Sequence, residues 1–202
     1  MRVGWAQVQQ LDVSHAPLNV AFIRHGEKPG EHGAPHGVNH HGEHDPHSLS
    51  VRGWTRAGGL ASLFAQVPTA QHPSLVVPQR IIATKPSAEA KSRREYDTAT
   101  PLARRLDVVI EDDLQHGDEA AVCAAVLGDA RDTLVVWHHG ALSELLRCFP
   151  ISNLNDVPKS WPEKRFDLIW ALHRDADDVE FTFAAMDQAL LSGDAGAQGT
   201  VV

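Results

Sequence analysis

Two histidines in this chain each stand before a glycine and shortly after a run of apolar residues. His25 follows residues 18–23 within the sequence Arg-His-Gly-Glu, and His139 follows residues 134–137. A neutral imidazole is a competent nucleophile toward phosphorus near pH 7. The guanidinium group of the neighbouring Arg24 disfavours the protonated imidazole, because like charges repel each other. The pattern therefore predicts that His25 attacks a phosphoryl group.

Arginine is the side chain that this chemistry needs around the nucleophile. Phosphoryl transfer requires the protein mainly to hold three equatorial oxygens, and a guanidinium group does so with planar, bidentate donors. Arg24 and Arg94 supply two such groups. We expect Arg94 in the first turn of a helix, where Ser92 and Glu95 form a capping box and unpaired backbone N–H groups also favour an anion. Arg93 is the alternative to Arg94, and this mechanism requires no metal ion or other cofactor.

Short apolar runs alternate along the chain with patterns typical of helices. Strands are expected at residues 18–23, 80–83 and 134–137, with a weaker candidate at 108–110 and later, antiparallel additions at 168–172 and 179–183. This alternation predicts an α/β fold, a three-layer α/β/α sandwich around a mostly parallel central sheet. In such sheets ligands collect at the carboxyl ends of the strands, so His25 and His139 should reach the same edge.

Helices are expected to cover both faces of this sheet. They are predicted at about residues 51–64, 92–106, 118–127 and 141–148. Ser50 has the residue type and the position of a cap for the first helix, and Pro101 should kink the second. Alternation along the strand before His139 places the neighbouring His138 on the opposite side, away from the site.

The bulk properties of the chain limit the classes of protein to which it can belong. Its 202 residues are long for one domain but short for two, so we expect one domain over residues 1–191 and a flexible tail over 192–202. The net charge of -8 argues against a general nucleic-acid or membrane binder, because both ligands require a basic surface. Residues 1–19 show neither a secretory signal nor an apolar span, which favours a cytoplasmic protein. The composition does not determine the oligomeric state.

The segment 28–48 is rich in histidine. It contains His32, His36, His40, His41, His44 and His47. A spacing of four would align several of them on a helix, but the glycines and prolines between them favour a loop. A structural zinc site usually has a tetrahedral ligand set fixed by regular elements, often with thiolates, which this segment lacks. We therefore expect a loop without a resident metal ion.

Four short motifs follow one another along the chain. They are RHGE at 24–27, SVRGWTRA at 50–57, Arg94 followed by Thr98-Ala99, and WHHG at 137–140. Together they resemble the histidine phosphatase superfamily, to which the phosphoglycerate mutases belong, over residues 18–146. The resemblance implies an α/β/α fold and a phosphohistidine on His25. It also implies phosphate contacts from Arg24, Arg94 and His139, the last of which stabilises the transferring group, and a carboxylic acid that protonates the leaving oxygen.

None of these motifs identifies the proton donor. Mutase-like members of the superfamily often carry it where this chain has Glu111, Asp112 and Asp113. The acid phosphatases have an aspartate where Gly140 stands here. We select Asp113 as the donor, with Glu27 as its rival and as a further contact to the substrate.

The reaction that we expect is hydrolysis of a phosphomonoester, so that the protein is a histidine phosphatase. Lys28 and Pro29 stand where the mutases usually have a threonine or serine, and the short chain also favours a hydrolase. The partner would be a small phosphorylated substrate or a phosphopeptide. Two alternatives stay open: transfer of the phosphoglycerate mutase type, and a non-catalytic module of the same fold that binds a phospho-ligand or a metal.

Overall fold

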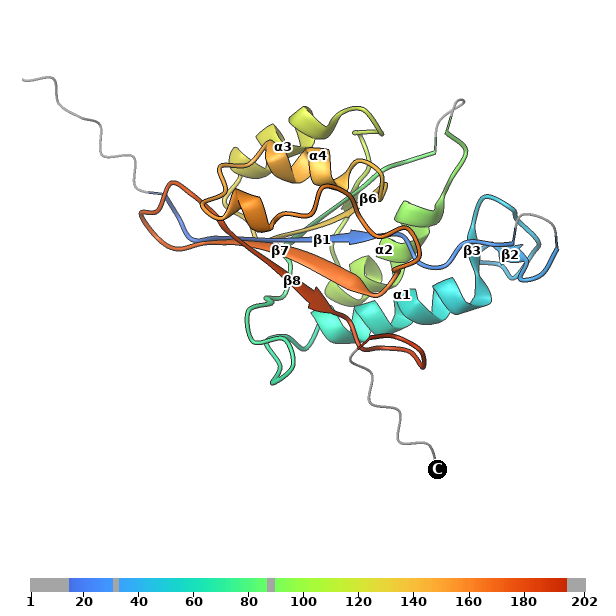
Figure 1. The fold of residues 1–202 in the computed structure, drawn as a ribbon. Helices are drawn as coiled ribbons and strands as arrows, with labels where there is room; N and C mark the ends of the chain where they lie inside the picture. Colours follow the sequence, from blue (N-terminus) through green and yellow to red (C-terminus); the bar gives the residue numbers. More distant parts are fainter. Residues whose placement is uncertain (1–14, 31–32, 87–89, 196–202) are drawn as a thin grey trace, which may run out of the picture.

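A six-stranded sheet forms the centre of the protein. The computed structural model describes residues 15–30, 33–86 and 90–195. The strands of the sheet are β1 (Leu18–Arg24), β4 (Arg80–Ala83), β5 (Ile110–Glu111), β6 (Thr133–Trp137), β7 (Leu168–Arg174) and β8 (Thr182–Asp187). Their order is β5-β4-β6-β1-β7-β8; the first four are parallel, β7 pairs antiparallel with β1, and β8 pairs antiparallel with β7 (Figure 1). The predicted sheet, with its late antiparallel additions, is confirmed.

Helices cover both faces of the sheet and complete three layers (Figure 1). The helices α1 (Val51–Phe64) and α2 (Arg94–Leu106) pack on one face, and α3 (Glu119–Leu127) and α4 (Leu142–Arg147) pack on the other. Successive residues of β1 alternate between the two cores: Phe22 packs with α3 and α4, and Ile23 with α1 and α2. Both faces are thus apolar, which explains why the strands are continuous apolar runs. Among the described residues, no helix is long and apolar enough to cross a membrane.

The two helices on the α1 face begin in different ways. Ser50 caps α1 as predicted, since its Oγ accepts a hydrogen bond of 3.2 Å from the N–H of Gly53. The capping box predicted for α2 is wrong, because this helix begins at Arg94 without a side-chain cap. The Ser92 hydroxyl instead donates to Oε2 of Glu95 at 3.1 Å. The Ser92 hydroxyl also accepts a long hydrogen bond of 3.4 Å from the N–H of Arg94, but the two contacts do not make the reciprocal pair of a capping box.

The segment 28–48 is irregular except for one small hairpin. β2 (Gly37–Val38) pairs antiparallel with β3 (Leu49–Ser50), so the prediction of a loop without regular elements is wrong at this point. The indole N–H of Trp54 in α1 donates to the carbonyl oxygen of Val38 at 2.8 Å. This contact fastens the hairpin to α1, next to which it lies in Figure 1. His32 lies outside the described residues.

Candidate active site

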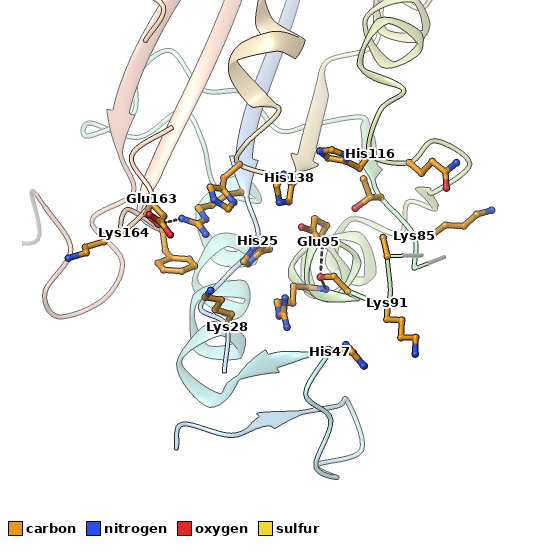
Figure 2. A pocket seen from close by; sticks show the side chains of 18 residues that line it. His25, Lys28, His47, Lys85, Lys91, Glu95, His116, His138, Glu163 and Lys164 are labelled. Carbon is orange, nitrogen blue, oxygen red and sulfur yellow. Dashed lines mark hydrogen bonds between the residues drawn. The ribbon is translucent and has the colours of Figure 1, made fainter. Parts of the chain in front are cut away.

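A cavity of about 1130 Å³ lies at the carboxyl ends of β1 and β6 (Figure 2). These strands are parallel neighbours, and Arg24 pairs with Trp137 where both strands end. The shared register brings His25 and His139 to one edge of the sheet, with ring centroids 6.2 Å apart. Arg24 and Arg94, the first residue of α2, line the same cavity. Four predicted site residues from three separate parts of the sequence are thus brought together.

His25 is neutral at pH 7 and has one ring nitrogen engaged by the protein. Its Nδ1 lies 2.6 Å from the carbonyl oxygen of Gly26, to which it can only donate, so the lone pair is on Nε2. Burial lowers the pKa of His25 to about 4. The charge of Glu95 opposes this shift, and the charges of Arg24 and Arg94 add to it. Repulsion by arginine predicts a neutral imidazole, and the structure shows that burial lowers the pKa of His25 more than this repulsion does.

Close packing against α1 requires a glycine directly after His25. A Cβ on Gly26 would lie only 2.8 Å from the backbone oxygen of Gly53 in α1. The N–H of Gly26 donates to the Thr98 hydroxyl at 2.8 Å, and this hydroxyl donates to the carbonyl oxygen of Arg94 at 2.6 Å. Thr98 therefore connects the loop that carries His25 to the helix that carries Arg94.

Arg24 is almost fully buried, and the surrounding chain holds its guanidinium group in place. Its Nη1 donates to the carbonyl oxygens of Glu163 and Arg165, and its guanidinium carbon lies 3.9 Å from the ring centroid of Phe166. Burial lowers its pKa to about 10, so it keeps its charge at pH 7. Among the described residues, no hydrogen-bond partner contacts its Nε. The contacts of Nη1 and of the Phe166 ring therefore hold the Arg24 guanidinium at the cavity wall.

Arg94 lines the cavity and the alternative, Arg93, does not. The Arg94 guanidinium donates to the carbonyl oxygens of Pro46 at 2.8 Å and Ser48 at 3.3 Å. Burial lowers its pKa from the ordinary value. Arg93 faces elsewhere and forms an ion pair of 3.8 Å with Asp97. The structure thus places Arg94 where the sequence predicts an anion-binding arginine.

His139 has a neighbour in the cavity that the sequence analysis placed outside it. Burial and, next, the charge of Arg24 lower the pKa of His139 to about 4. His138 also lines the cavity, with its ring centroid 4.8 Å from that of His139. The prediction that His138 points away is wrong, because β6 ends at Trp137 and strand alternation does not continue beyond it. The Nδ1 atoms of both histidines are buried without a hydrogen-bond partner in the described part of the chain.

Glu95 is a cavity residue that the sequence analysis interpreted only as part of a cap. It is 3% exposed and lines the cavity (Figure 2). Among charged groups, it has the largest influence on the pKa of His25, Arg24 and Arg94, which it raises in each case. The spacing of three from Ser92 is the same for a capping box and for this contact. The position of Glu95 directly after Arg94 was the signal in the sequence that could have indicated a place in the cavity.

The structure does not bring Asp113, the predicted proton donor, to the cavity. Asp113 is exposed and is not among the lining residues. β5 ends at Glu111, and the chain that follows it contributes Gln115 and His116 to the cavity wall instead. His116 packs against His138 with ring centroids 4.8 Å apart.

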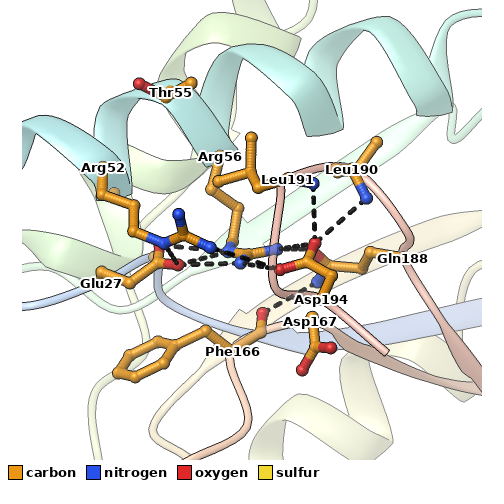
Figure 3. A network of polar contacts seen from close by, with 12 residues as sticks. Glu27, Arg52, Thr55, Arg56, Phe166, Asp167, Gln188, Leu190, Leu191 and Asp194 are labelled. Carbon is orange, nitrogen blue, oxygen red and sulfur yellow. Dashed lines mark hydrogen bonds and ion pairs between the residues drawn. The ribbon is translucent and has the colours of Figure 1, made fainter. Parts of the chain in front are cut away.

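Glu27, the rival donor and predicted substrate contact, belongs to a separate ionic network (Figure 3). Its Oε1 accepts hydrogen bonds from Arg56 at 2.8 Å and from Arg52 at 3.1 Å. Arg56 is buried and also donates to Asp194 at 2.7 Å. Glu27 does not line the cavity of His25. The same network fixes Asp194 on the domain, although the prediction placed it in a flexible tail; residues 196–202 lie outside the described residues.

The described histidines of the 28–48 segment do not form a metal site. Across residues 15–30, 33–86 and 90–195, no group of three or more His, Cys, Asp or Glu side chains is placed to hold a metal ion. The rings of His36 and His44 contact each other with centroids 5.6 Å apart, whereas His47 lines the cavity. One described histidine of the segment thus reaches the candidate site, which Lys28 at the start of the segment also lines.

Comparison with solved structures identifies the fold. The protein histidine phosphatase SixA complexed with tungstate matches with a TM-score of 0.53 at 15% identity, over 84% of this chain and 97% of that chain. Mycobacterial hydrolase 1 matches with a TM-score of 0.52 at 16% identity, over 85% of this chain and 98% of that chain. This chain has the histidine phosphatase fold. No protein-family model matches it, and no curated protein matches it.

Within this histidine phosphatase fold, the cavity combines a neutral imidazole with two guanidinium groups. The imidazole of His25 is neutral, and the guanidinium groups of Arg24 and Arg94 lie on the wall around it. Guanidinium groups bind the oxygens of a tetrahedral anion through charge-assisted hydrogen bonds. The arrangement is therefore suited to attack by nitrogen on a bound phosphoryl group.

Proposed function

We propose that this protein is a phosphatase of the histidine phosphatase superfamily, which hydrolyses a phosphomonoester through a phosphohistidine on His25. The observation that carries the proposal is the state of His25. Its Nδ1–H is engaged by the Gly26 carbonyl oxygen, which leaves the lone pair on Nε2 in a cavity that also holds Arg24, Arg94 and His139. A nucleophile that is already deprotonated needs no general base for its own activation.

The reaction proceeds in two displacements at phosphorus. In the first, Nε2 of His25 forms a bond to phosphorus while the bond to the ester oxygen breaks. In the second, a water oxygen attacks the phosphohistidine, the N–P bond breaks and inorganic phosphate leaves. Arg24 and Arg94 neutralise the charge on the equatorial oxygens throughout, which is the main contribution that proteins make to phosphoryl transfer.

His139 contributes to the same anion-binding surface. Its ring is nearly perpendicular to that of His25, at 83°, and both rings line the same cavity. A bound dianion favours the protonated imidazolium, because opposite charges attract. His139 then donates to a phosphoryl oxygen as charge develops in the transition state.

Two further observations support a phosphorylated substrate. Basic side chains cluster around the cavity of a protein whose net charge is -8; the lysines among them are Lys28, Lys85, Lys91 and Lys164. Positive charge focused in one cleft attracts an anionic substrate despite an acidic surface elsewhere. SixA, which shares the fold, was solved with tungstate, a tetrahedral oxyanion. We expect an anion of that geometry to bind between Arg24 and Arg94.

The direct test is detection of the covalent intermediate. The protein is incubated with 4-nitrophenyl phosphate in the presence of a chelator and quenched in alkali, and the peptide containing His25 is examined by mass spectrometry. We expect a phosphoryl group on His25, release of inorganic phosphate, and loss of both in His25→Ala. His36→Ala is the matched control, because His36 is exposed and does not line the cavity.

Other outcomes separate the remaining functions. Turnover that survives in His25→Ala and stops with the chelator contradicts the mechanism. A phosphohistidine whose phosphoryl group passes to 3-phosphoglycerate, without release of phosphate, indicates a mutase. Binding of phosphate without a phosphohistidine or turnover indicates a non-catalytic module.

A further inference from the structure

Glu95 is a buried carboxyl group in a cavity whose other charged groups are mostly basic. It is the second residue of α2, directly after the anion-binding Arg94, and it is 3% exposed. A carboxylate is an unfavourable neighbour for a bound phosphoryl dianion, since both are negative. An anion-binding cavity gains nothing in affinity from such a group, so its presence there calls for a chemical role.

The orientation of Glu95 is fixed by the protein. The Ser92 hydroxyl donates to its Oε2 at 3.1 Å. Figure 2 shows the carboxyl group on the cavity wall next to His25, with this hydrogen bond drawn as a dashed line. Its charge raises the pKa of His25 more than any other charged group does, which agrees with this proximity. The carboxyl group therefore lines the same cavity as His25, in which the substrate of the proposed reaction would bind.

The other acidic side chains are less suited to move a proton at this place. Glu163 also lines the cavity, but its side chain is exposed, and it is its backbone oxygen that holds Arg24. Asp113 is exposed outside the cavity, and Glu27 is engaged by Arg56. Among the described acidic residues that line the cavity, Glu95 is the buried one.

We propose that Glu95 is the general acid and general base of the reaction; this inference rests on the proposed phosphatase function. A bound dianion favours the protonated form of the neighbouring carboxyl group. As the P–O bond of the ester breaks, the Glu95 carboxylic acid gives its proton to the leaving oxygen and becomes a carboxylate. It then accepts a proton from the water that attacks phosphorus, and the N–P bond electrons return to Nε2 of His25. The alcohol, inorganic phosphate and the original enzyme are the products.

The test uses two substrates whose leaving groups differ in their need for protonation. Nitrophenolate leaves without protonation, whereas the alkoxide of glycerol 2-phosphate does not. Rapid mixing and alkaline quench measure the rate of His25 phosphorylation with each substrate. For Glu95→Gln we expect a loss of about 10²-fold with glycerol 2-phosphate and less than about 3-fold with 4-nitrophenyl phosphate, because general acids contribute roughly 10²–10⁴-fold. Hydrolysis of the phosphohistidine should slow as well, so that nitrophenol is released in a burst.

Two variants serve as controls. Glu144→Gln removes an exposed carboxylate on α4, outside the cavity, and should leave both rates unchanged. Glu95→Asp keeps the acid on a shorter side chain and should restore part of the glycerol 2-phosphate rate. Thermal unfolding of each variant shows whether the fold is intact.

Three results would overturn the assignment of Glu95. An equal loss of the phosphorylation rate with both substrates means that Glu95 only positions the arginines. Unchanged rates with both substrates mean that it takes no part, and a leaving-group-dependent loss in Asp113→Asn instead transfers the role to that residue. All three presuppose a phosphohistidine in the wild type, so they are distinct from a failure of the proposed function, in which none forms.

Discussion

Burial of a neutral His25 predicts a specific pH dependence of stability. The pKa of His25 is lowered to about 4 in the folded protein, from about 6.5 in an unfolded chain. Between these values the unfolded state binds a proton that the folded state does not bind. Linkage then requires stability to increase with pH, so the contribution of His25 is fully present above pH 6.5 and is lost as the pH falls toward 4.

The size of this effect follows from the two pKa values. The difference corresponds to about 3 kcal/mol over the whole window, of which about 2 kcal/mol is lost between pH 7 and pH 5. Other groups titrate over the same range, so the useful quantity is a difference between two proteins. His25→Gln removes the titrating imidazole and keeps a polar side chain in its place.

Urea unfolding at pH 7 and pH 5 measures the free energy of unfolding of both proteins. The wild type should lose about 2 kcal/mol more than His25→Gln over this interval, whatever their absolute stabilities. The same state of His25 should keep kcat/KM nearly constant from pH 7 down to pH 5. If both proteins lose the same free energy, to within about 0.5 kcal/mol, His25 is not a buried neutral imidazole and the nucleophile argument fails.

Two further predictions concern the residues that surround the nucleophile. Arg94→Ala should lower kcat/KM for 4-nitrophenyl phosphate by about 10²–10³-fold, and Arg93→Ala by less than about 3-fold, because Arg93 does not line the cavity and pairs with Asp97 instead; similar losses in both would show that the cavity does not distinguish them. Thr98→Val should lower the free energy of unfolding by about 1–3 kcal/mol in urea titrations and reduce activity as well, since it leaves the N–H of Gly26 unsatisfied and uncouples His25 from α2; full activity in this variant would exclude Thr98 as the connection.

The parts of the site that depend on regular secondary structure could be predicted from the sequence. Apolar runs before His25 and His139 indicate two buried strands, and the parallel arrangement of a doubly covered sheet brings their carboxyl ends together. The helix that starts at Arg94 was predicted to within about two residues, which is the usual precision of such boundaries. Local patterns were sufficient here because strand and helix geometry fix the direction of each side chain.

The prediction failed where the chain leaves regular structure or where a partner is distant in sequence. His138 lies beyond the end of β6, so alternation along the strand gave the wrong side. Glu27 is engaged by Arg56 and, through it, by Asp194, a partner that no local pattern reveals. Glu95 shows another reason: a serine followed three positions later by a glutamate predicts a cap, and here the same spacing instead joins the two side chains at the cavity wall.

The histidines and the arginines of the proposed site are positioned by different parts of the fold. The β1–β6 register places His25 and His139 through backbone pairing within the sheet, which loop changes do not disturb. The arginine side chains are held by backbone oxygens of two surface segments: Arg24 by residues 163–165, and Arg94 by residues 46–48. Backbone oxygens accept from arginine whatever the local side chains are, so these segments can change in sequence while the cation stays in place. The two guanidinium groups therefore depend on the course of these segments, whereas the two histidines depend on the sheet.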